Sequence, residues 1–506
     1  MKKLLILTSL MVALIAPGCK KEYLQTKPTD QIALEEVFTS TTNASAVING
    51  IYAYMNTRTT TTTSNAQGKP GVGGILLGID FMGEDLHQAA ATWFTSTGEG
   101  NYVSPRTDTH ASNLYYYRTF YRMINNANYV LDNIDLPSVT GLESEKIRLK
   151  AEALTIRAYA YSYLVQFYGT RYNAAAKPNV QLGVPLVLTT ADLIKPRATV
   201  EDVYTQIVAD LDKAIALNST TKTNKTHADV WVAKGLRARV ALTMQDYPNA
   251  VKYAKDVIDG GKYPLMSQSD YVSGFNNNAL SEFMWCAMPT TEQGDTFGSF
   301  YAQIAYNANT TYMRGTPKMI NSNLYNQIPV NDVRRKLWEP APTAANFPLP
   351  TTAFTRRAYM SRKFSVKTVG DPSLGDTPWM RSAEMYLILA EAYARSGQDP
   401  LAQAALFALV SKRDLTAVQS TKTGTALVDE IMINRRVELW GEGFRYLDLK
   451  RLNLPLDRTA ANVPNYVGTS VANLLTIPAG DVKFLFLIPR DELNANPLIP
   501  QSAQNP

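Results

Sequence analysis

The sequence predicts a mainly α-helical protein: a helical-repeat scaffold with long inserted loops and little β-structure. Over long stretches, apolar residues recur at three- and four-residue spacing, which is typical of one face of an α-helix. The stretches between them are rich in Thr, Asn, Gly and Pro and lack sustained periodicity, as loops do. We therefore expect the helical scaffold over residues 31–56, 113–260 and 380–452, and loop-rich regions over residues 57–112 and 263–379.

Chain length and composition limit the possible size of the core, the number of domains and the class of partner. The chain has 506 residues, of which 45% are hydrophobic, enough to form a large core. A length of about 150 residues per domain would suggest about three domains, but a helical repeat extends as one unit. We expect a single domain over residues 19–506. The net charge of +6 is not concentrated in a long basic run, so we expect no nucleic-acid partner.

Residues 1–18 have the form of a secretory leader. Two lysines precede an apolar run that is shorter than the about 20 residues needed to span a membrane. The small residue Gly18 directly before Cys19 resembles a bacterial lipobox, which implies cleavage before Cys19 and attachment of lipid to this residue. Two or more acyl chains anchor a protein stably, whereas one binds only marginally. The alternatives are an ordinary secretory signal with an incidental cysteine, and a disulfide between Cys19 and Cys286.

Four helical segments are predicted in the first half of the chain. Apolar spacing places them at residues 31–55 (as two short pieces), 113–134, 145–168 and 199–217. Thr199 starts the last of these, because Asp202 three residues later completes the spacing of a capping box. Gly169 follows the third segment, and glycine suits a helix C-terminus.

Later segments follow a helical-repeat pattern. The motif YLILAEAY at residues 386–393 has the spacing of a tetratricopeptide helix, and residues 231–235 and 250–254 follow the pattern more loosely. Such repeats pair antiparallel helices, which bury their faces against the neighbouring pair. We expect about four such pairs along the chain. The region 263–379 between them lacks strong helices and is too long for a plain connector, so we expect it to be functional or a subdomain.

Residues 429–451 are predicted to form one helix with a mostly apolar stripe. Oppositely charged residues lie three positions apart beside this stripe, at 435/438, 442/445 and 445/448. Gly441 and Gly443 interrupt the helix at a cost of about 1 kcal/mol each if it is exposed. They therefore indicate a close backbone approach or a bend.

The same residues resemble a family signature. The motif R-x-x-E-L-W-G-E-G-x-R-x-x-D-L-x-R, from Arg435 to Arg451, resembles the C-terminal signature of the SusD/RagB family of nutrient-binding outer membrane lipoproteins. Residues 49–52 (NGIY), residues 151–169 and the end of the chain from 488 to 505 resemble further family segments. The resemblance covers nearly the whole chain after the leader and is weakest in the loops.

This resemblance implies both a fold and a function. Members of the family have a tetratricopeptide-like helical scaffold with long inserted loops, and they pass nutrients to a SusC-like TonB-dependent transporter. For this chain the resemblance implies binding of an oligosaccharide (glycan) at the cell surface and delivery to such a transporter. It also implies an outer membrane anchor through lipid on Cys19, and neither catalysis nor a cofactor.

The resemblance further implies that the ligand surface lies on the inserted loops. Aromatic rings pack on the apolar face of a sugar, while Asp, Asn and Arg side chains bond its hydroxyls. By location and residue type, the candidate ligand-binding residues are Asp80, Trp93, Phe94, Tyr102, Arg106, Tyr306, Tyr312 and Trp338. Burial in the core is the competing role for each of them.

Few residues suggest catalysis. The three histidines, His87, His110 and His227, have neither an H-E-x-x-H pattern nor a nearby cysteine cluster, so we expect no metal site. The sequence contains no G-x-S-x-G elbow and no phosphate-binding G-x-x-x-x-G-K-[ST] loop. Glu438 and Glu442 are a carboxylate pair of the kind that glycosidases use. We expect instead that the arginines at 435, 436 and 445 hold them ionised, which removes the raised pKa of a general acid.

Three alternative functions remain open from the sequence. A peptide-binding protein of the RagB-like branch would show a deep polar cavity rather than stacked aromatic residues. A surface glycosidase would need two unpaired carboxyl groups facing each other across a cleft. A helical-repeat adaptor that binds only protein would need a broad concave groove free of long loops.

Overall fold

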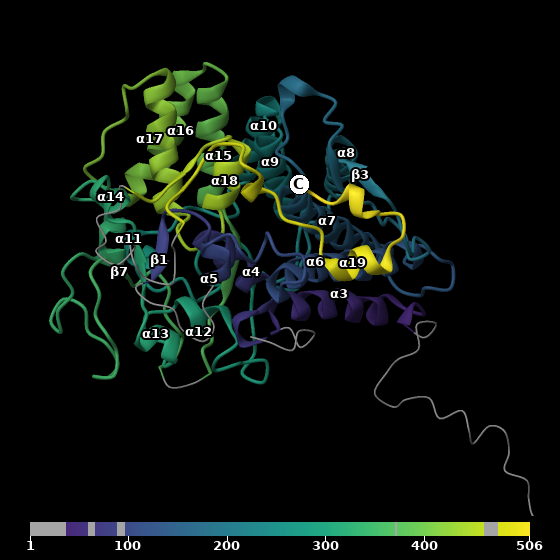
Figure 1. The fold of residues 1–506 in the computed structure, drawn as a ribbon, viewed down its shortest axis with the longest axis horizontal. Coiled ribbons are helices and arrows are strands. Elements are labelled where there is room, and N and C mark those ends of the chain that lie inside the picture. Colours follow the sequence, from purple (N-terminus) through teal and green to yellow (C-terminus); the bar gives the residue numbers. More distant parts are fainter. Residues whose placement is uncertain (1–36, 59–65, 89–96, 370–371, 460–473) are drawn as a thin grey trace, which may run out of the picture.

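The structure is a computed structural model that describes residues 37–58, 66–88, 97–369, 372–459 and 474–506 (Figure 1). The predicted leader with Cys19 lies outside these residues, as do Trp93 and Phe94. Within these ranges, none of the helices is both long and apolar enough to cross a membrane.

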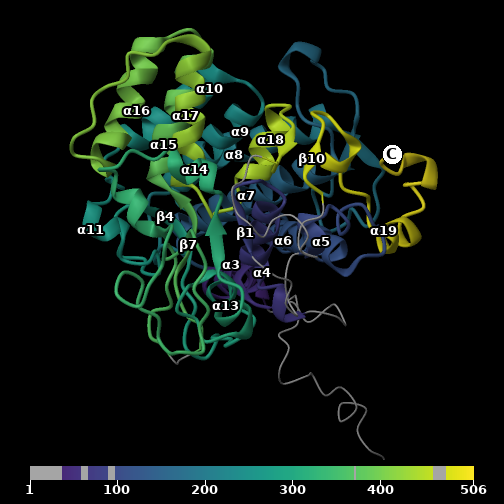
Figure 2. The same ribbon diagram turned by 60° about the vertical axis from the view of Figure 1, so that its left-hand side comes forward.

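Helices packed side by side form the frame of the molecule. The longer ones are α3 (Thr41–Asn56), α6 (Ala111–Asn133), α7 (Glu143–Tyr168), α8 (Val200–Ala216), α9 (Val230–Thr243), α10 (Tyr247–Asp259), α15 (Ser382–Arg395), α16 (Asp399–Arg413) and α17 (Gly424–Glu438). α7 contacts α6 and α8, α9 contacts α8 and α10, and α15 packs against α10, α16 and α17 (Figure 1, Figure 2). The array therefore continues at α15 after a long insertion, and the predicted helical-repeat scaffold is confirmed.

Local sequence explains where these helices begin. Thr199 Oγ1 accepts a hydrogen bond from the backbone N–H of Asp202, and the Asp202 carboxylate accepts one from the backbone N–H of Thr199. This is the predicted capping box, which is confirmed. Asp229 and Asp246 start α9 and α10 in a related way, because each side chain accepts from the backbone N–H three residues later.

The predicted helix over residues 429–451 is in fact two helices. α17 ends at Glu438 and α18 (Arg445–Arg451) begins after a turn, so the prediction of one helix is wrong. Gly441 and Gly443 have φ angles of +78° and +84°, in the left-handed region that glycine adopts readily. A Cβ atom on Gly443 would lie 2.7 Å from Cδ2 and 2.9 Å from Cα of Leu76. The glycines therefore mark both a bend and a close approach, as the sequence indicated.

The predicted loop region 57–112 contains a buried helix. α4 (Gly71–Phe81) is buried at every position, so the prediction of loop at these residues is wrong. A helix buried on all sides has no polar face and lacks the amphipathic period by which helices are recognised. Its glycines allow close packing, since a Cβ on Gly73 would lie 3.0 Å from Cβ of Phe300. Two short elements follow, β1 (Leu86–Gln88) and α5 (Thr97–Gly100).

The insertion between α10 and α15 packs around a second hydrophobic core, to which α4, β1 and α17 also contribute side chains, so whether the insertion is a separate subdomain stays a prediction. β4 (Phe283–Ala287) and β8 (Thr377–Arg381) pair antiparallel and join its two ends. A second sheet has the strand order β1-β5-β7-β6 and so links the 57–112 region to the insertion. The other elements of the insertion are α11 (Gln268–Tyr271), α12 (Phe300–Ile304), α13 (Thr311–Arg314), β5 (Lys318–Ile320), α14 (Ser322–Asn326), η5 (Val333–Leu337), β6 (Trp338–Glu339) and β7 (Met360–Ser361).

The C-terminal segment returns to the helical frame. The backbone N–H of Phe486 donates to the carbonyl of Phe167 at 2.9 Å, which places this segment along the end of α7. The remaining short elements are η3 (Ala66–Gly68), η4 (Ala174–Ala176), β2 (Leu182–Pro185), β3 (Arg197–Thr199), β9 (Leu456–Asp457), β10 (Thr476–Ile477), η6 (Val482–Phe484), α19 (Arg490–Ala495) and η7 (Gln501–Ala503).

Candidate functional site

The carboxylate pair Glu438 and Glu442 is buried in an ion network. Glu438 Oε1 lies 3.1 Å from Arg381 Nη1 and 3.0 Å from Arg413 Nη2, and its other oxygen lies 3.5 Å from Arg334 Nη1. Burial alone would raise the pKa of Glu438, but these guanidinium groups hold it well below its usual range. Glu438 therefore stays ionised and cannot serve as a proton donor.

Glu442 is held in the same way. Its carboxylate accepts from Arg381 Nε at 2.9 Å and from Lys363 Nζ at 2.6 Å. Burial opposes ionisation, and the two cations outweigh it, so the pKa of Glu442 is also lowered. The predicted ionised state is confirmed for both glutamates. The cations that hold them, however, come from the insertion and from α16.

The arginines beside the two glutamates have other partners. Arg435 Nε donates to Asp448 at 2.8 Å, and Arg436 Nε donates to both oxygens of Asp85 at 3.0 Å. Arg445 pairs with Glu84. The predicted helical pairing of these arginines with the glutamates is therefore wrong, because other carboxylates bind all three. Arg436 and Arg445 bind the segment after α4 to the C-terminal helices, and Arg435 joins α17 to α18.

Two predicted ligand-binding residues lie in the core. The Asp80 carboxylate accepts from the backbone N–H groups of Gly443 and Phe444 at 3.0 and 3.1 Å, and burial raises its pKa to about 7. Tyr102 donates through its hydroxyl to the carbonyl of Met82 at 2.7 Å and is buried. Both side chains are occupied in packing, because α4, which was expected to be a loop, lies inside the molecule.

Two other candidates are partly accessible. Arg106 donates to the carbonyl of Leu485 at 2.6 Å and to that of Pro506, so it holds the C-terminal segment. The ring of Tyr306 packs edge-on against Phe347, with ring centroids 5.5 Å apart. Trp93, Phe94 and the side chain of Tyr312 lie outside the described part of the structure, so their ligand-binding role stays a prediction.

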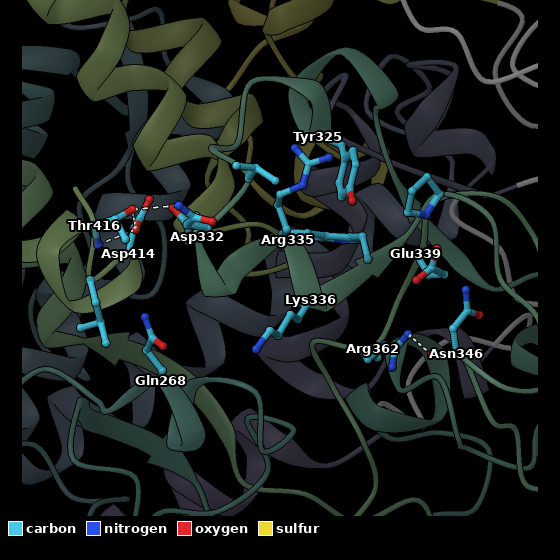
Figure 3. A pocket seen from close by; sticks show the side chains of 15 residues that line it. Gln268, Tyr325, Asp332, Arg335, Lys336, Glu339, Asn346, Arg362, Asp414 and Thr416 are labelled. Carbon is cyan, nitrogen blue, oxygen red and sulfur yellow. Dashed lines mark hydrogen bonds between the residues drawn. The ribbon is translucent and has the colours of Figure 1, made fainter. Parts of the chain in front are cut away.

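One cavity of the described structure is an open cleft of about 790 Å³. It lies between η5 and β6 of the insertion and the turn that follows α16. Asp414 and Thr416 lie at one end, Arg335 and Lys336 in the middle, and Glu339, Asn346 and Arg362 at the other end (Figure 3). The remaining lining residues are Gln268, Tyr325, Val330, Asn331, Asp332, Trp338, Pro340 and Leu415.

The local sequence of residues 332–338 determines which side chains line one wall of the cleft. The Asp332 side chain caps η5 by accepting from the backbone N–H of Arg334 at 2.8 Å. Arg334 turns inward, where its guanidinium binds Asp332 at 2.7 Å, so the next two residues, Arg335 and Lys336, line the cleft. Trp338 follows them and also contributes to the lining. Trp338 is only 1% exposed, however, and packs edge-on against Trp440 in the hydrophobic core.

The polar groups of the cleft are held in place by few bonds. Arg335 lies 4.4 Å from the centroid of the Tyr325 ring and donates to the carbonyl of Ile328 at 2.7 Å. Asn331 Nδ2 donates to Thr416 Oγ1 at 3.0 Å and so connects the two walls. These groups retain further hydrogen-bonding capacity toward the cleft, since a guanidinium has five N–H donors and an amide has two donors and an acceptor.

Among the predicted ligand-binding residues whose side chains the structure describes, Trp338 is the one that lines this cleft. Tyr306 contributes indirectly, because Arg362, a lining residue, lies 4.0 Å from the centroid of the Phe347 ring on which Tyr306 packs. Arg335, Lys336 and the residues of the turn after α16 also line the cleft, but they were not among the residues predicted from the sequence. The basic run at 334–336, directly before Leu337-Trp338, was the signal that could have located part of the cleft.

Comparisons with known proteins agree with this architecture. A family model described as "Starch-binding associating with outer membrane" matches residues 22–242, and the "SusD family" model matches residues 268–506. The chain belongs to the SusD family. The predicted SusD-like fold is thereby confirmed, and the family is one of carbohydrate-binding, outer membrane-associated proteins.

Solved structures share the fold of this SusD-family chain along almost its whole length. A SusD superfamily protein from Bacteroides thetaiotaomicron is 27% identical, with a TM-score of 0.78 over 92% of this chain and 100% of that one. A SusD-like carbohydrate binding protein from Bacteroides vulgatus is 24% identical, with a TM-score of 0.77 over 91% of this chain and 97% of that one.

Curated relatives match over shorter stretches. SusD-like protein P2 of Formosa agariphila is 25% identical over 61% of this chain, and a SusD-like protein of Bacteroides ovatus is 26% identical over 32% of it. The matched stretches cover 57% and 30% of the lengths of these two relatives.

Proposed function

We propose that this SusD-family protein binds an oligosaccharide at the cell surface, without altering it chemically, and delivers it to a SusC-like TonB-dependent transporter. The observation that carries the proposal is an open cleft lined by amide, hydroxyl, guanidinium and carboxylate groups, in a chain of a carbohydrate-binding family. A similarly folded structure, 20% identical, is named a laminarin binding SusD-like protein, which gives an example of such a ligand.

The size and chemistry of the cleft suit a short glycan. Its volume of about 790 Å³ lies within the usual range of about 300–1,000 Å³ for ligand sites. Sugar hydroxyls both donate and accept hydrogen bonds, and Asn331, Asn346 and Thr416 offer the complementary groups. An open site also suits transfer, because a ligand that must be released to a transporter should not be fully enclosed or very tightly held.

Several features support binding without catalysis. Glycoside hydrolysis needs one carboxyl group that can donate a proton and a second that acts as base or nucleophile. Glu438 and Glu442 are buried and ionised, and Asp332 of the cleft is paired with Arg334. Within the described residues, no group of three or more His, Cys, Asp or Glu side chains is arranged to hold a metal ion.

The proposal includes the membrane anchor. Lipid attached to Cys19 would tether the protein to the outer membrane, and the residues that follow would link the anchor to α3. Labelling cells with radioactive palmitate tests this step. The wild-type chain should incorporate label and fractionate with the outer membrane, whereas a Cys19→Ala variant should do neither.

Isothermal calorimetry tests the binding step. The chain from residue 20 onward would be titrated with a panel of neutral and acidic oligosaccharides and of peptides. We expect saturable binding of an oligosaccharide, weakened about three- to tenfold in an Asn331→Ala variant, because this exposed amide lines the cleft. Asn494→Ala, which changes an exposed amide on α19, is the matched control and should bind as the wild type does. Binding of peptides alone would contradict the proposal and favour a RagB-like function.

A further inference from the structure

Three cations of the cleft form no ion pair with a carboxylate of the residues that the structure describes. Lys336 is exposed and makes no hydrogen bond or ion pair within the described part of the chain. Arg335 donates to the carbonyl of Ile328, and Arg362 donates to that of Asn346 at 2.9 Å. Neither guanidinium forms an ion pair with a carboxylate of the described residues. All three cations line one continuous space (Figure 3).

The acidic residues of the cleft do not neutralise these cations. Asp332 is bound to Arg334 at 2.7 Å. One oxygen of Asp414 accepts from both the backbone N–H and the hydroxyl of Thr416, at 2.8 and 2.7 Å. Glu339 lies at the Arg362 end, where it accepts from the backbone N–H of Ala341 (Figure 3). In the middle of the cleft, Arg335 and Lys336 therefore form no ion pair with a described carboxylate, and the three cations of the lining outnumber Asp414 and Glu339, the two carboxylates that also lack one.

The two guanidinium groups are also pre-oriented. Arg335 stacks on the Tyr325 ring at 4.4 Å, and Arg362 stacks on the Phe347 ring at 4.0 Å. A planar guanidinium held on an aromatic face loses less conformational entropy when it forms paired hydrogen bonds to an oxyanion. Lysine next to such a group adds a mobile positive charge that can follow the anion.

We propose that the oligosaccharide bound in this cleft carries an anionic substituent, a uronate carboxylate or a sulfate ester, and that Arg335 and Lys336 bind it. This inference rests on the proposed function and narrows its ligand to acidic glycans. The oxyanion accepts hydrogen bonds from Arg335 and Lys336, and Arg362 lies near a neighbouring sugar unit. The neutral hydroxyls of the glycan then bond the amides and hydroxyls of the same cleft.

Matched sugar pairs test this inference. The chain from residue 20 onward would be titrated calorimetrically with oligogalacturonide and its carboxyl-reduced counterpart, with sulfated galactan oligosaccharide and its desulfated counterpart, and with neutral laminari-oligosaccharide. One acidic sugar should bind at least tenfold more tightly than its own neutral counterpart. This difference in affinity should become smaller when the salt concentration rises from 50 to 300 mM, because salt screens exposed charges. If the difference in affinity is seen with oligogalacturonide, the cleft binds a carboxylate; if it is seen with sulfated galactan, the cleft binds a sulfate ester.

Variants assign the effect to the cleft. Lys336→Gln should weaken binding of the acidic sugar about tenfold and so remove most of its affinity advantage over the neutral counterpart. Lys252→Gln removes an exposed lysine of α10, outside the cleft, and should change neither. A neutral sugar that binds as tightly as its acidic counterpart would overturn this inference and leave the proposed function standing. If no sugar of the panel binds, both are overturned.

Discussion

The buried network around Glu438 and the middle of the cleft are both rich in arginine and lysine, but their charges have different partners. Arg381 and Arg413, which are fully buried, each bind Glu438 and Glu282. Arg335 and Lys336 face the cleft and have no carboxylate partner among the described residues. A buried ion costs several kcal/mol unless it is paired, whereas an exposed ion costs little. An unpaired charge, rather than a dense group of charges, therefore marks the surface that is free to bind a ligand.

The largest effect is expected from breaking the buried network. Glu438→Gln removes the charge that faces Arg381, Arg413 and Arg334, and leaves buried guanidinium groups uncompensated. We expect a loss of about 3–5 kcal/mol in the free energy of unfolding, measured by urea denaturation. A loss below about 1 kcal/mol would show that the network does not depend on this carboxylate and would weaken the contrast with the cleft.

A pH titration tests the difference between paired and unpaired charges in the core. Asp80 is a buried carboxylate that binds backbone N–H groups instead of a cation. Burial raises its folded-state pKa to about 7, above the usual unfolded value of about 3.9. Its favourable contribution to stability is thus complete below pH 4 and is lost as the pH rises toward and through 7. The unfolding free energy of Asp80→Asn, measured relative to that of the wild type, should therefore rise by up to about 4 kcal/mol between pH 4 and pH 8. A difference in unfolding free energy that does not change with pH would contradict the raised pKa.

The turn between α17 and α18 gives a third test. Gly443→Ala places a Cβ within 2.9 Å of Leu76 at a φ of +84°, so we expect a loss of about 2–4 kcal/mol in unfolding free energy. Gly50→Ala is the matched control. A Cβ on Gly50, within α3, meets nothing within 4 Å, so this change should stabilise the protein by about 0.5–1 kcal/mol. Equal effects of the two substitutions would show that the turn is not tightly packed.

The smallest effect on stability is expected in the cleft. Lys336→Gln removes an exposed, unpaired charge and should change the unfolding free energy by less than about 0.5 kcal/mol, measured in the same urea titrations. If Lys336→Gln were as destabilising as Glu438→Gln, Lys336 would have a structural role and the distinction between the two regions would fail.

Sequence reasoning predicted the frame better than the site. Helices α6, α7 and α8 were predicted because each shows regular apolar spacing, and the start of α8 because Thr199 and Asp202 suffice for its cap. α4 was missed because a helix buried on all sides has no amphipathic period. Because the α4 segment was expected to be a loop, Asp80 was predicted to bind ligand, although its side chain lies in the core. The cleft was largely missed because its lining comes from segments more than 60 residues apart in the sequence, such as 268, 332–340 and 414–416.

The sequence by itself determined the family and the helical-repeat frame, because these depend on local spacing and on short motifs. It also indicated that Glu438 and Glu442 are ionised, but the cations that hold them so are Arg381, Arg413 and Lys363, not the arginines nearest in sequence. The tertiary structure alone decided which arginine meets which carboxylate, and which basic residues are left without a partner. Ion pairing is a through-space property of side chains from distant segments, and the fold brings Arg381 and Arg413 to Glu438 and Asp85 to Arg436. For the same reason, the unpaired cations of the cleft become visible only once the chain is folded.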